Sequence, residues 1–548
     1  MADETFDIAI IGGGVTGCGA ALDAASRGLS VALIEQRDFA SGTSSRSSKL
    51  IHGGLRYLEQ RHFALVREAR YEQALLLTRL CPHLVRPIPF LFPLTHRIWE
   101  RLYIGAGVLL YDQFGRSVLP RHRHLSRSAV LRGFPALRGD TLVGGIQYYD
   151  AQIDDARHTL TLARTAALHG AALATSVRAV GFEKDRGRVC AVRARCLETG
   201  SDLEIRARQI INATGVWTER VHGLAGGGQL RVRASKGIHL LVPRHRIDAN
   251  GGLILRTEHS VLFVIPWYEH WIIGTTDTSW DLDLDHPAAS RADIDYLLTT
   301  LNGVLSDPLG HDDIFGVYAG LRPLLYGEDD ATSKLSREHA VSTADSGLIS
   351  VAGGKYTTYR VMAKDAVDLA ASRLEADVQR CRTDRLPLLG ADGFPECKAR
   401  CAEFARDVGL PEKRVERLLD RYGSLVVELL ALIADRPDLG ECLEGAGSYL
   451  RVEALYAATH EGALHLDDLL TRRTRISIET EDRGLRAAES ICELVAETLG
   501  WSPEIREREL SHYRARVAAE RESQEQRDDR TADAARLGAP DVRTGGRA

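Results

Sequence analysis

The sequence lacks paired cysteines and any strong excess of charge of one sign. Nine cysteines are scattered over 548 residues, and no two of them form a CxxC pair. An odd, dispersed set fits reduced thiols and argues against a disulfide framework, and no zinc-type spacing is present, so we expect no metal site. The formal net charge is only -5, which gives no general reason to expect nucleic acid as a partner.

Long apolar runs are also missing. The most apolar window, LYIGAGVLLY at 102–111, is about half of the roughly 20 residues that a membrane-spanning helix needs. Acidic residues precede the first apolar run, MADETFDIAIIGGG, whereas a signal peptide would carry basic ones. Trp99, Arg97 and Arg101 beside the 102–111 window would suit a contact with a membrane surface, but a buried helix or a dimer contact fits equally well. We therefore expect a soluble or peripheral protein.

The N-terminal 35 residues predict a strand, a helix and a second strand. FDIAII at 6–11 is typical of a buried parallel strand, and a glycine-rich turn follows it. The helical pattern after the turn ends at Gly28, and SVALIE at 30–35 forms the next strand. This order is a βαβ unit.

A glycine motif lies at the turn of this unit. Gly12, Gly14 and Gly17 satisfy G-x-G-x-x-G, and Glu35 closes the second strand. Gly12 permits a tight turn, Gly14 lets a pyrophosphate approach the backbone, and Gly17 lets helix and strand pack closely. The helix N-terminus can bind phosphates, and Glu35 can accept hydrogen bonds from ribose hydroxyls. A turn without a ligand is the alternative, but the strand and helix on either side favour a dinucleotide site.

Two later stretches favour FAD as the dinucleotide. INATGVW at 211–217 ends a predicted strand and contains Ala213 and Gly215. GGKYTTYR at 353–360 opens a predicted helix and contains Gly354, Lys355 and Thr357. An NAD site does not need a second distant helix start, whereas a helix N-terminus can stabilise charge on a reduced flavin. Val177, in the strand expected at 171–180, is assigned to the same site.

The remaining patterns divide the chain into parts. We predict a discontinuous Rossmann-like α/β FAD-binding domain with a β-rich α+β substrate domain and a C-terminal all-α domain. The predicted ranges are 1–80, 145–235 and 325–380 for the FAD-binding domain, 81–144 and 236–324 for the substrate domain, and 385–519 for the helical domain. Residues 520–548 contain almost no large apolar residue and are predicted to be a disordered tail.

These stretches together resemble one family. The matching segments are DIAIIGGGVTGCGAALDAASRGLSVALIE, TSSRSSKLIHGGLRYLE, YYDAQIDDAR, INATGVW, SKGIHLLVP, FVIPW with IIGTTD, YAGLRPL and GGKYTTYR, with RYGS and DDLLTRRTR further on. The sequence is similar to the FAD-dependent, quinone-linked glycerol-3-phosphate dehydrogenases among the amino-acid-oxidase-like flavoproteins. This resemblance implies oxidation of sn-glycerol 3-phosphate to dihydroxyacetone phosphate, with electrons passing to a membrane quinone. It also implies a homodimer in the cytoplasm, peripheral on the inner face of the cytoplasmic membrane.

If FAD is the cofactor, the segment from Thr43 to Tyr57 is expected to contact it. Thr43, Ser44, Ser45 and Ser48 are expected along the FAD, and Gly53-Gly54 would let the backbone pass close to the flavin ring. Arg46 interrupts this run of small residues.

The substrate needs cations at its phosphate and a base at its hydroxyl. Arg56 and Arg322 are the predicted holders of these groups, because the guanidinium is a planar fork of donors. Lys355 and Tyr57 are predicted to assist them. His52 and His239 are the candidate bases, with His52 preferred, and Arg322 could also stabilise an alkoxide.

Three alternatives remain at this point. One is an oxidase that acts on the same substrate and passes its electrons to O2, releasing H2O2. A second is an amine or amino-acid oxidase, for which a carboxylate-binding clamp would be expected. A third is a non-catalytic FAD-holding scaffold, which would have no reason to retain Arg56, Arg322 and Lys355.

Overall fold

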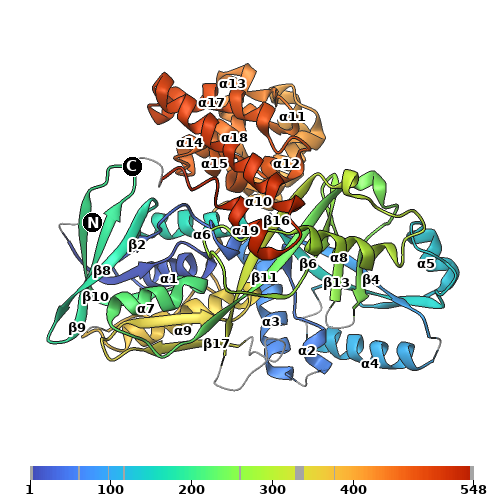
Figure 1. Cartoon of the computed structure of the whole chain (residues 1–548), viewed down its shortest axis with the longest axis horizontal. Coiled ribbons are helices and arrows are strands. Elements are labelled where there is room, and N and C mark those ends of the chain that lie inside the picture. The colour runs from blue at the N-terminus through green and yellow to red at the C-terminus, as the bar shows by residue number, and fades with distance from the viewer. Residues whose placement is uncertain are drawn as a thin grey trace.

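Two β-sheets lie next to each other, and a helical lobe sits above them (Figure 1). The structure is a computed structural model and describes residues 4–59, 62–96, 98–114, 118–257, 261–326, 338–375 and 377–543. Arg97, which the sequence suggested for a membrane contact, lies outside these residues, as does the side chain of Arg56.

The first sheet is built around β1, with the strand order β17-β18-β10-β1-β2-β7 and the β8–β9 ribbon attached to β10. β1 pairs in parallel with β10 and β2, as its run of buried isoleucines predicts. Helix α1 packs against both α6 and α9. The bounds are β1 Thr5–Ile11, α1 Val15–Ser26, β2 Val31–Ile34, α6 Asp155–Leu168, β7 Ala172–Ala174, β8 Val177–Asp185, β9 Arg188–Cys196, β10 Asp202–Asn212, α7 Thr218–Ala225, β17 His339–Thr343, β18 Ile349–Gly353 and α9 Tyr359–Ala371.

The second sheet is mostly antiparallel, with the order β15-β11-β14-β13-β12-β4-β6-β3, and β16 and β5 pair with β11 and β6. Its bounds are β3 Leu50–Ile51, β4 Val85–Leu94, β5 Arg123–Ser126, β6 Gly144–Ile153, β11 Val232–Pro243, β12 Gly252–Arg256, β13 Val261–Trp267, β14 His270–Gly274, β15 Thr278–Trp280 and β16 Gly316–Leu325. The helices around it are α2 Arg56–Glu59, α3 Phe63–Leu75, α4 Trp99–Phe114, α5 Arg127–Gly133 and α8 Arg291–Asn302.

Parts of the predicted FAD-binding domain belong to the second sheet, among them Leu50–Ile51, which form β3 beside β6. Residues 145–153 were assigned to the FAD-binding domain, but they form β6, which pairs with β4 along its whole length in the second sheet. The error has a simple cause: an apolar strand carries no local mark of the sheet that it joins.

The C-terminal lobe is helical, as predicted, with a short β-hairpin. It comprises α10 Phe394–Ala399, α11 Cys401–Val408, α12 Glu412–Tyr422, α13 Val426–Asp435, β19 Cys442–Leu443, β20 Ala446–Leu450, α14 Arg451–His460, α15 Leu466–Asp468, α16 Ile476–Glu479, α17 Leu485–Leu499 and α18 Pro503–Glu525. Two apolar clusters fill its interior. The predicted class of α/β, β-rich α+β and all-α parts is therefore confirmed.

The predicted disordered tail is wrong for residues 520–543. Helix α18 continues to Glu525, and α19 spans Asp529–Arg536. Arg543 donates to Asp468 at 2.8 Å and to the Ser176 hydroxyl at 2.8 Å. Ala532 is fully buried against an apolar cluster. The tail is held by ion pairs and small side chains from distant parts of the chain, so its lack of large apolar residues misled the prediction.

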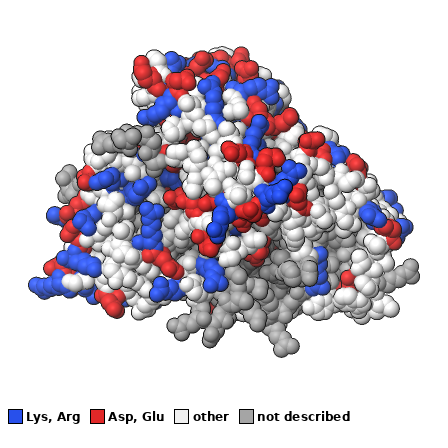
Figure 2. Space-filling view, in the orientation of Figure 1, with Lys and Arg blue, Asp and Glu red and all other residues white. Residues whose placement is uncertain are grey.

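The surface carries mixed charge. Figure 2 shows positive and negative side chains interspersed over the upper lobe, whereas the region over α4 is mostly uncharged. Within the described ranges, no helix combines the length and apolarity required to cross a bilayer. The same ranges contain no group of three or more His, Cys, Asp or Glu side chains that could hold a metal ion.

Candidate active site

A cavity of about 880 Å3 runs from the glycine motif after β1 to helix α4. Its walls come from the carboxyl end of β1, from β11 and β16 of the second sheet, and from the loop between β2 and β3. The chain thus brings together segments from residue 11 to residue 362, which the sequence alone presents far apart.

The glycine motif forms one end of the cavity. Gly12 has a φ of +112°, and a Cβ there would meet the Ala213 carbonyl oxygen at 2.7 Å. A Cβ on Gly17 would lie 1.9 Å from the Gly12 carbonyl oxygen. Gly14 is the N-cap of α1 and has no side chain between the helix and the cavity. Since a Cβ does not fit at Gly12 or Gly17 and Gly14 carries none, the backbone N–H groups at the start of α1 stay accessible to a phosphate.

Glu35 lies in the cavity wall directly after β2. Its carboxylate accepts hydrogen bonds from the Gly13 N–H at 2.7 Å and from the Arg37 N–H at 2.9 Å. Burial raises the pKa of Glu35, and these two N–H groups oppose that rise. Glu35 therefore braces the glycine turn as well as facing the cavity. Val177, Ala213 and Gly215 line the same end.

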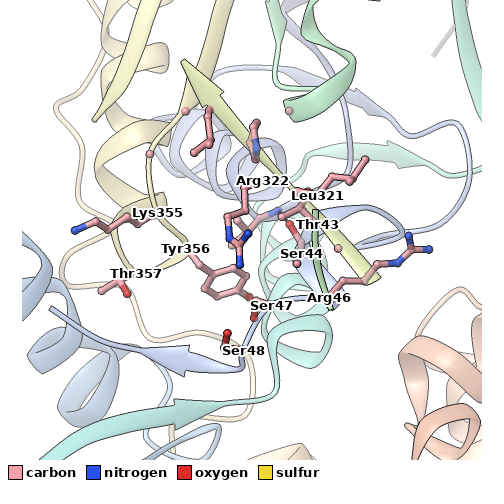
Figure 3. A pocket seen from close by; sticks show the side chains of 18 of the residues that line it. Thr43, Ser44, Arg46, Ser47, Ser48, Leu321, Arg322, Lys355, Tyr356 and Thr357 are labelled. Carbon is pink, nitrogen blue, oxygen red and sulfur yellow. Dashed lines mark hydrogen bonds between the residues drawn. The ribbon is translucent and has the colours of Figure 1, made fainter. Parts of the chain in front are cut away.

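The loop from Thr43 to Ser48 crosses the middle of the cavity (Figure 3). The Thr43 hydroxyl donates to the Leu321 carbonyl oxygen at 2.6 Å, and the Ser44 hydroxyl accepts from the Val15 N–H at 2.9 Å. The Ser48 hydroxyl is 2.8 Å from Nε2 of His239. Thr43, Ser44 and Ser48 thus line the cavity, whereas the buried Ser45 is not part of its wall.

The glycine turn after β18 fixes the loop that holds His52. The Thr357 hydroxyl accepts from the His52 N–H and donates to the His52 carbonyl oxygen, both at 3.2 Å. Gly354 lines the cavity with a φ of +76°, and Lys355 places its ammonium 3.6 Å from the centre of the Tyr57 ring. Two segments 300 residues apart, which the sequence assigned to one site, therefore do meet.

Arg322 enters the cavity from β16. Its Nη2 donates to the Thr275 hydroxyl at 3.0 Å and to the Thr276 carbonyl oxygen at 3.1 Å. Its Nη1 lies 3.3 Å from the Asp277 carboxylate. These residues follow β14 in the stretch IIGTTD, to which the sequence assigned no role. They hold the guanidinium in one orientation, which is what a fixed anion-binding residue needs.

Both candidate histidines line the cavity, in different surroundings. His239 is almost fully buried, and its ring stacks on Tyr318 with centroids 4.8 Å apart. Burial, helped by the nearby positive charges of Arg322 and Lys49, presses the pKa of His239 well below its usual value. His52 is only half-buried, and its ring meets Phe263 edge-on.

Sequence reasoning missed the residues that support the loop from behind. The Tyr111 hydroxyl on α4 accepts from the Gly53 N–H at 2.7 Å and donates to Asp150 at 2.6 Å. Lys49 is not part of the cavity wall and pairs with Asp155 at 2.8 Å, with both side chains fully buried. No local pattern announces such partners, which lie dozens to hundreds of residues away.

The C-terminal lobe also binds carboxylates of the FAD-binding part. Arg472 and Arg473 both bind the carboxylate of Asp38, the latter through two hydrogen bonds at 2.7 and 2.8 Å. Arg475 binds Asp154 at 2.6 Å and also Asp155. The stretch DDLLTRRTR thus anchors the lobe to segments that lie next to the cavity.

Comparison with known proteins gives matches over nearly the whole chain. Residues 7–423 match the family described as FAD dependent oxidoreductase, and residues 381–506 match the C-terminal domain of alpha-glycerophosphate oxidase. A glycerol-3-phosphate dehydrogenase from Mycobacterium leprae is 56% identical over 543 residues, which cover 99% of this chain and 93% of that protein. The human mitochondrial glycerol-3-phosphate dehydrogenase is 36% identical over 534 residues, 93% of this chain and 72% of that protein.

A solved structure shows the same fold. The crystal structure of a glycerol-3-phosphate dehydrogenase from Bacillus halodurans in complex with FAD has a TM-score of 0.79 and 29% identity, and covers 94% of this chain and 95% of that one. An L-alpha-glycerophosphate oxidase from Mycoplasma pneumoniae, at 19% identity and a TM-score of 0.56, shares the fold over 70% of this chain.

The cavity fits the FAD that these matches confirm as the cofactor. A Cβ on Gly12 or Gly17 would collide with the backbone, so the turn stays free of side chains, as a pyrophosphate site requires. Nε1 of Trp217 lies buried in the wall with no hydrogen-bond partner among the described residues, so the protein offers a donor to a ligand there. The chain is accordingly an oxidoreductase.

Proposed function

We propose that this chain, which belongs to the family of FAD dependent oxidoreductases, oxidises sn-glycerol 3-phosphate to dihydroxyacetone phosphate and passes the electrons to a membrane quinone. The observation that carries this proposal is one cavity that joins a dinucleotide cradle to a set of fixed cationic donors. The names of the relatives at 56% and 36% identity support the same substrate.

The cationic end of the cavity suits the substrate phosphate. Arg322 is held by Thr275 and Thr276, and the Lys355 ammonium lies over the Tyr57 ring. Charge-assisted hydrogen bonds from such groups to a phosphate oxygen are about twice as strong as neutral ones. Arg322 and Lys355, with Arg56 from α2, would therefore bind and orient the substrate, and Tyr57 would add a hydroxyl donor.

FAD, when bound, supplies the hydride acceptor. The protein must remove the proton of the C2 hydroxyl as the hydride leaves, and a histidine is the suitable base near neutral pH. The low pKa of the buried His239 makes it a weak base, and its Nε2 is engaged with Ser48. We therefore assign the base to His52 and a supporting role to His239.

Two histidine variants separate these roles. Replacing His52 by Asn should slow flavin reduction by roughly 100- to 10,000-fold, the usual contribution of a general base. His239→Asn, which keeps a polar side chain beside Ser48, should slow it far less. The comparison is made by anaerobic rapid mixing, and the reverse order of the two rates would exchange the assignments.

Helix α4 supports the membrane side of the proposal. Ile98 and, on α4, Leu102 are 74% and 69% exposed, and Trp99 and Leu109 are also exposed. The same helix contributes Tyr103 to the mouth of the cavity. An exposed apolar helix face favours contact with a lipid surface, and this one would bring a lipid-dissolved quinone to the flavin. The homodimer and the cytoplasmic face of the membrane stay predictions.

Leu102→Asp tests the membrane contact. It should weaken binding to anionic lipid vesicles roughly tenfold or more, because it removes apolar contact and adds a charge of the wrong sign. Leu168→Asp, at the equally exposed Leu168 on α6, is the matched control. Equal loss of vesicle binding in both variants would mean that α4 is not the contact.

Reoxidation of the reduced enzyme separates the two acceptors. Fast return of the oxidised flavin band with a quinone analogue and slow return in air supports the dehydrogenase. Fast return in air with release of H2O2 supports the alternative, an oxidase. Arg322→Ala should abolish reduction by substrate while leaving bound FAD in place, and full turnover in that variant would refute the substrate site.

A further inference from the structure

A second, smaller cavity lies behind the loop from Thr43 to Ser48, which we call the flavin loop. It measures about 40 Å3 and is closed by the segment after β2 on one side and by α18 and the chain after α19 on the other. Five arginines line it, of which Arg472 is already paired with Asp38 and Asp468. We refer to the other four as the arginine cluster: Arg37, Arg46, Arg516 and Arg536. Arg536 and the chain after α19, which form part of its wall, belong to the range predicted to be disordered.

Two members of the cluster come from the FAD-binding part. Arg37 is 6% exposed; its Nη1 donates to the Asp285 carbonyl oxygen at 3.0 Å, but Nε and Nη2 have no hydrogen-bond partner among the described residues. The Arg46 side chain forms no hydrogen bond or ion pair within the part of the chain that the structure describes. In Figure 3 it extends away from Arg322 and Tyr356. The unused donors of Arg37 are buried, and such buried guanidinium donors are costly unless a ligand binds them.

The carboxylates nearby are already shared. Glu520 lies 3.0 Å from Arg516 and 3.6 Å from Arg536, and Asp467 pairs with both Arg472 and Arg516. Glu509 is bound to His465, and Asp541 lies beside Arg543. The cluster therefore keeps an excess of positive charge.

The titration behaviour agrees with this excess. Burial and the neighbouring charges of Arg37, Arg516 and Arg536 lower the pKa of Arg46 to about 9. Burial and the same arginines, with Arg536 foremost, lower the pKa of His286, which lines the cavity, to about 2. His286 is therefore neutral at pH 7 and does not add to the repulsion, and it can still offer a ring N–H.

We propose that the arginine cluster binds a phosphate-class dianion. A guanidinium presents a planar fork that matches phosphate oxygens, and four of them around one cavity suit a tetrahedral anion. The volume admits about three water molecules, roughly the bulk of a single phosphate group, so only an inorganic phosphate or the terminal phosphate of a larger molecule fits.

Position gives this site a function. Arg46 lines both cavities, since it lies between Ser44 and Ser48 in the loop that crosses the flavin site. An anion held by Arg46 and Arg536 ties this loop to the C-terminal segment. Binding of phosphate at the cluster should therefore slow the loss of FAD. This role is separate from the oxidation of substrate proposed above.

The test must separate this site from the proposed substrate site, which also binds phosphate. All measurements therefore use FAD-loaded protein with the background substitution Arg322→Gln. Calorimetric titration with inorganic phosphate, at constant ionic strength set with chloride, should show one site. Adding Arg37→Gln, or separately Arg536→Gln, should weaken it about tenfold or more, as loss of a charge-assisted hydrogen bond implies.

The matched control is Arg193→Gln, which removes an exposed guanidinium from the first sheet and should leave phosphate binding unchanged. No binding in the background protein, or equal binding in all variants, would overturn the proposal. Two cluster variants on different segments guard against one of them failing to fold.

A second titration identifies the source of the phosphate. Glycerol 2-phosphate is a phosphate monoester, and its binding with the same dependence on Arg37 assigns the site to the phosphate end of a metabolite. Binding of inorganic phosphate alone assigns it to the free ion. In either case the dissociation rate of FAD should fall in the presence of the bound anion, and an unchanged rate would refute the coupling through Arg46.

Discussion

Arg475→Met removes the buried cation that connects the C-terminal lobe to the flavin loop. In the native protein Arg475 binds Asp154 at 2.6 Å and also Asp155, and all three side chains are buried. Asp155 in turn accepts from the N–H and the hydroxyl of Ser47 at 3.0 and 2.7 Å. Loss of Arg475 leaves the two carboxylates with Lys49, which pairs with Asp155, and Arg421, which lies 3.7 Å from Asp154.

The cost follows from the burial of the pair. Removing one partner of a buried ion pair typically destabilises a protein by about 3–5 kcal/mol, because the other charge is left without compensation. A loss of this size makes a locally opened loop roughly 100- to 5,000-fold more populated at 25 °C. Since Asp155 holds Ser47 in the flavin loop, we expect the variant to lose FAD before its C-terminal lobe unfolds.

Urea titration with two probes measures this effect. Flavin fluorescence reports release of FAD, and far-ultraviolet circular dichroism reports unfolding of the helices. Arg486→Met is the control, because Arg486 pairs with Asp482 at the surface, where such pairs contribute about 0–1 kcal/mol. If Arg475→Met releases FAD at the same urea concentration as the control, the assigned link between lobe and loop is wrong.

Three further variants test separate features. Tyr111→Phe removes the hydroxyl between Gly53 and Asp150, so flavin reduction should slow and stability should fall by about 1–3 kcal/mol in urea titration; unchanged values would refute this support. Burial opposes a charged His465, but hydrogen bonds to two carboxylates outweigh it and raise its pKa to about 9. The stability lost in His465→Gln should therefore be greatest below pH 6.5 and should disappear above about pH 9. An equal loss of stability at pH 6 and pH 10 would contradict the pairing. Gly17→Ala places a Cβ 1.9 Å from a backbone oxygen and should yield protein without FAD by absorbance, unlike Gly223→Ala, whose Cβ meets open space.

Local patterns predicted the parts of the site whose chemistry is local. Gly12, Gly14 and Gly17 can be identified from their spacing alone, because the turn, the helix start and the close packing all lie between residues 12 and 17. Thr357 and Lys355 were found in the same way, from glycines before a helix. Arg322 was found only through its resemblance to the family segment YAGLRPL.

Long-range polar contacts could not be predicted in this way. Lys49 lies within a segment that the sequence marked as a binding loop, yet its ammonium pairs with Asp155 behind the cavity. Arg543 holds the tail through Asp468, 75 residues earlier in the chain. Such pairs depend on the folded positions of both partners, and neither partner carries a periodic or compositional mark. Arg46 was noticed only as an interruption, because the cavity behind it is formed by the tail.

Anaerobic mixing of the FAD-loaded protein with sn-glycerol 3-phosphate tests the central claim most directly. The account predicts that the oxidised flavin band bleaches and that one dihydroxyacetone phosphate forms for each flavin reduced, while the Arg322→Ala variant keeps its FAD and stays oxidised. If the wild-type flavin stays oxidised with substrate in excess, the proposed reaction is wrong, and only the FAD-binding fold and its cofactor remain.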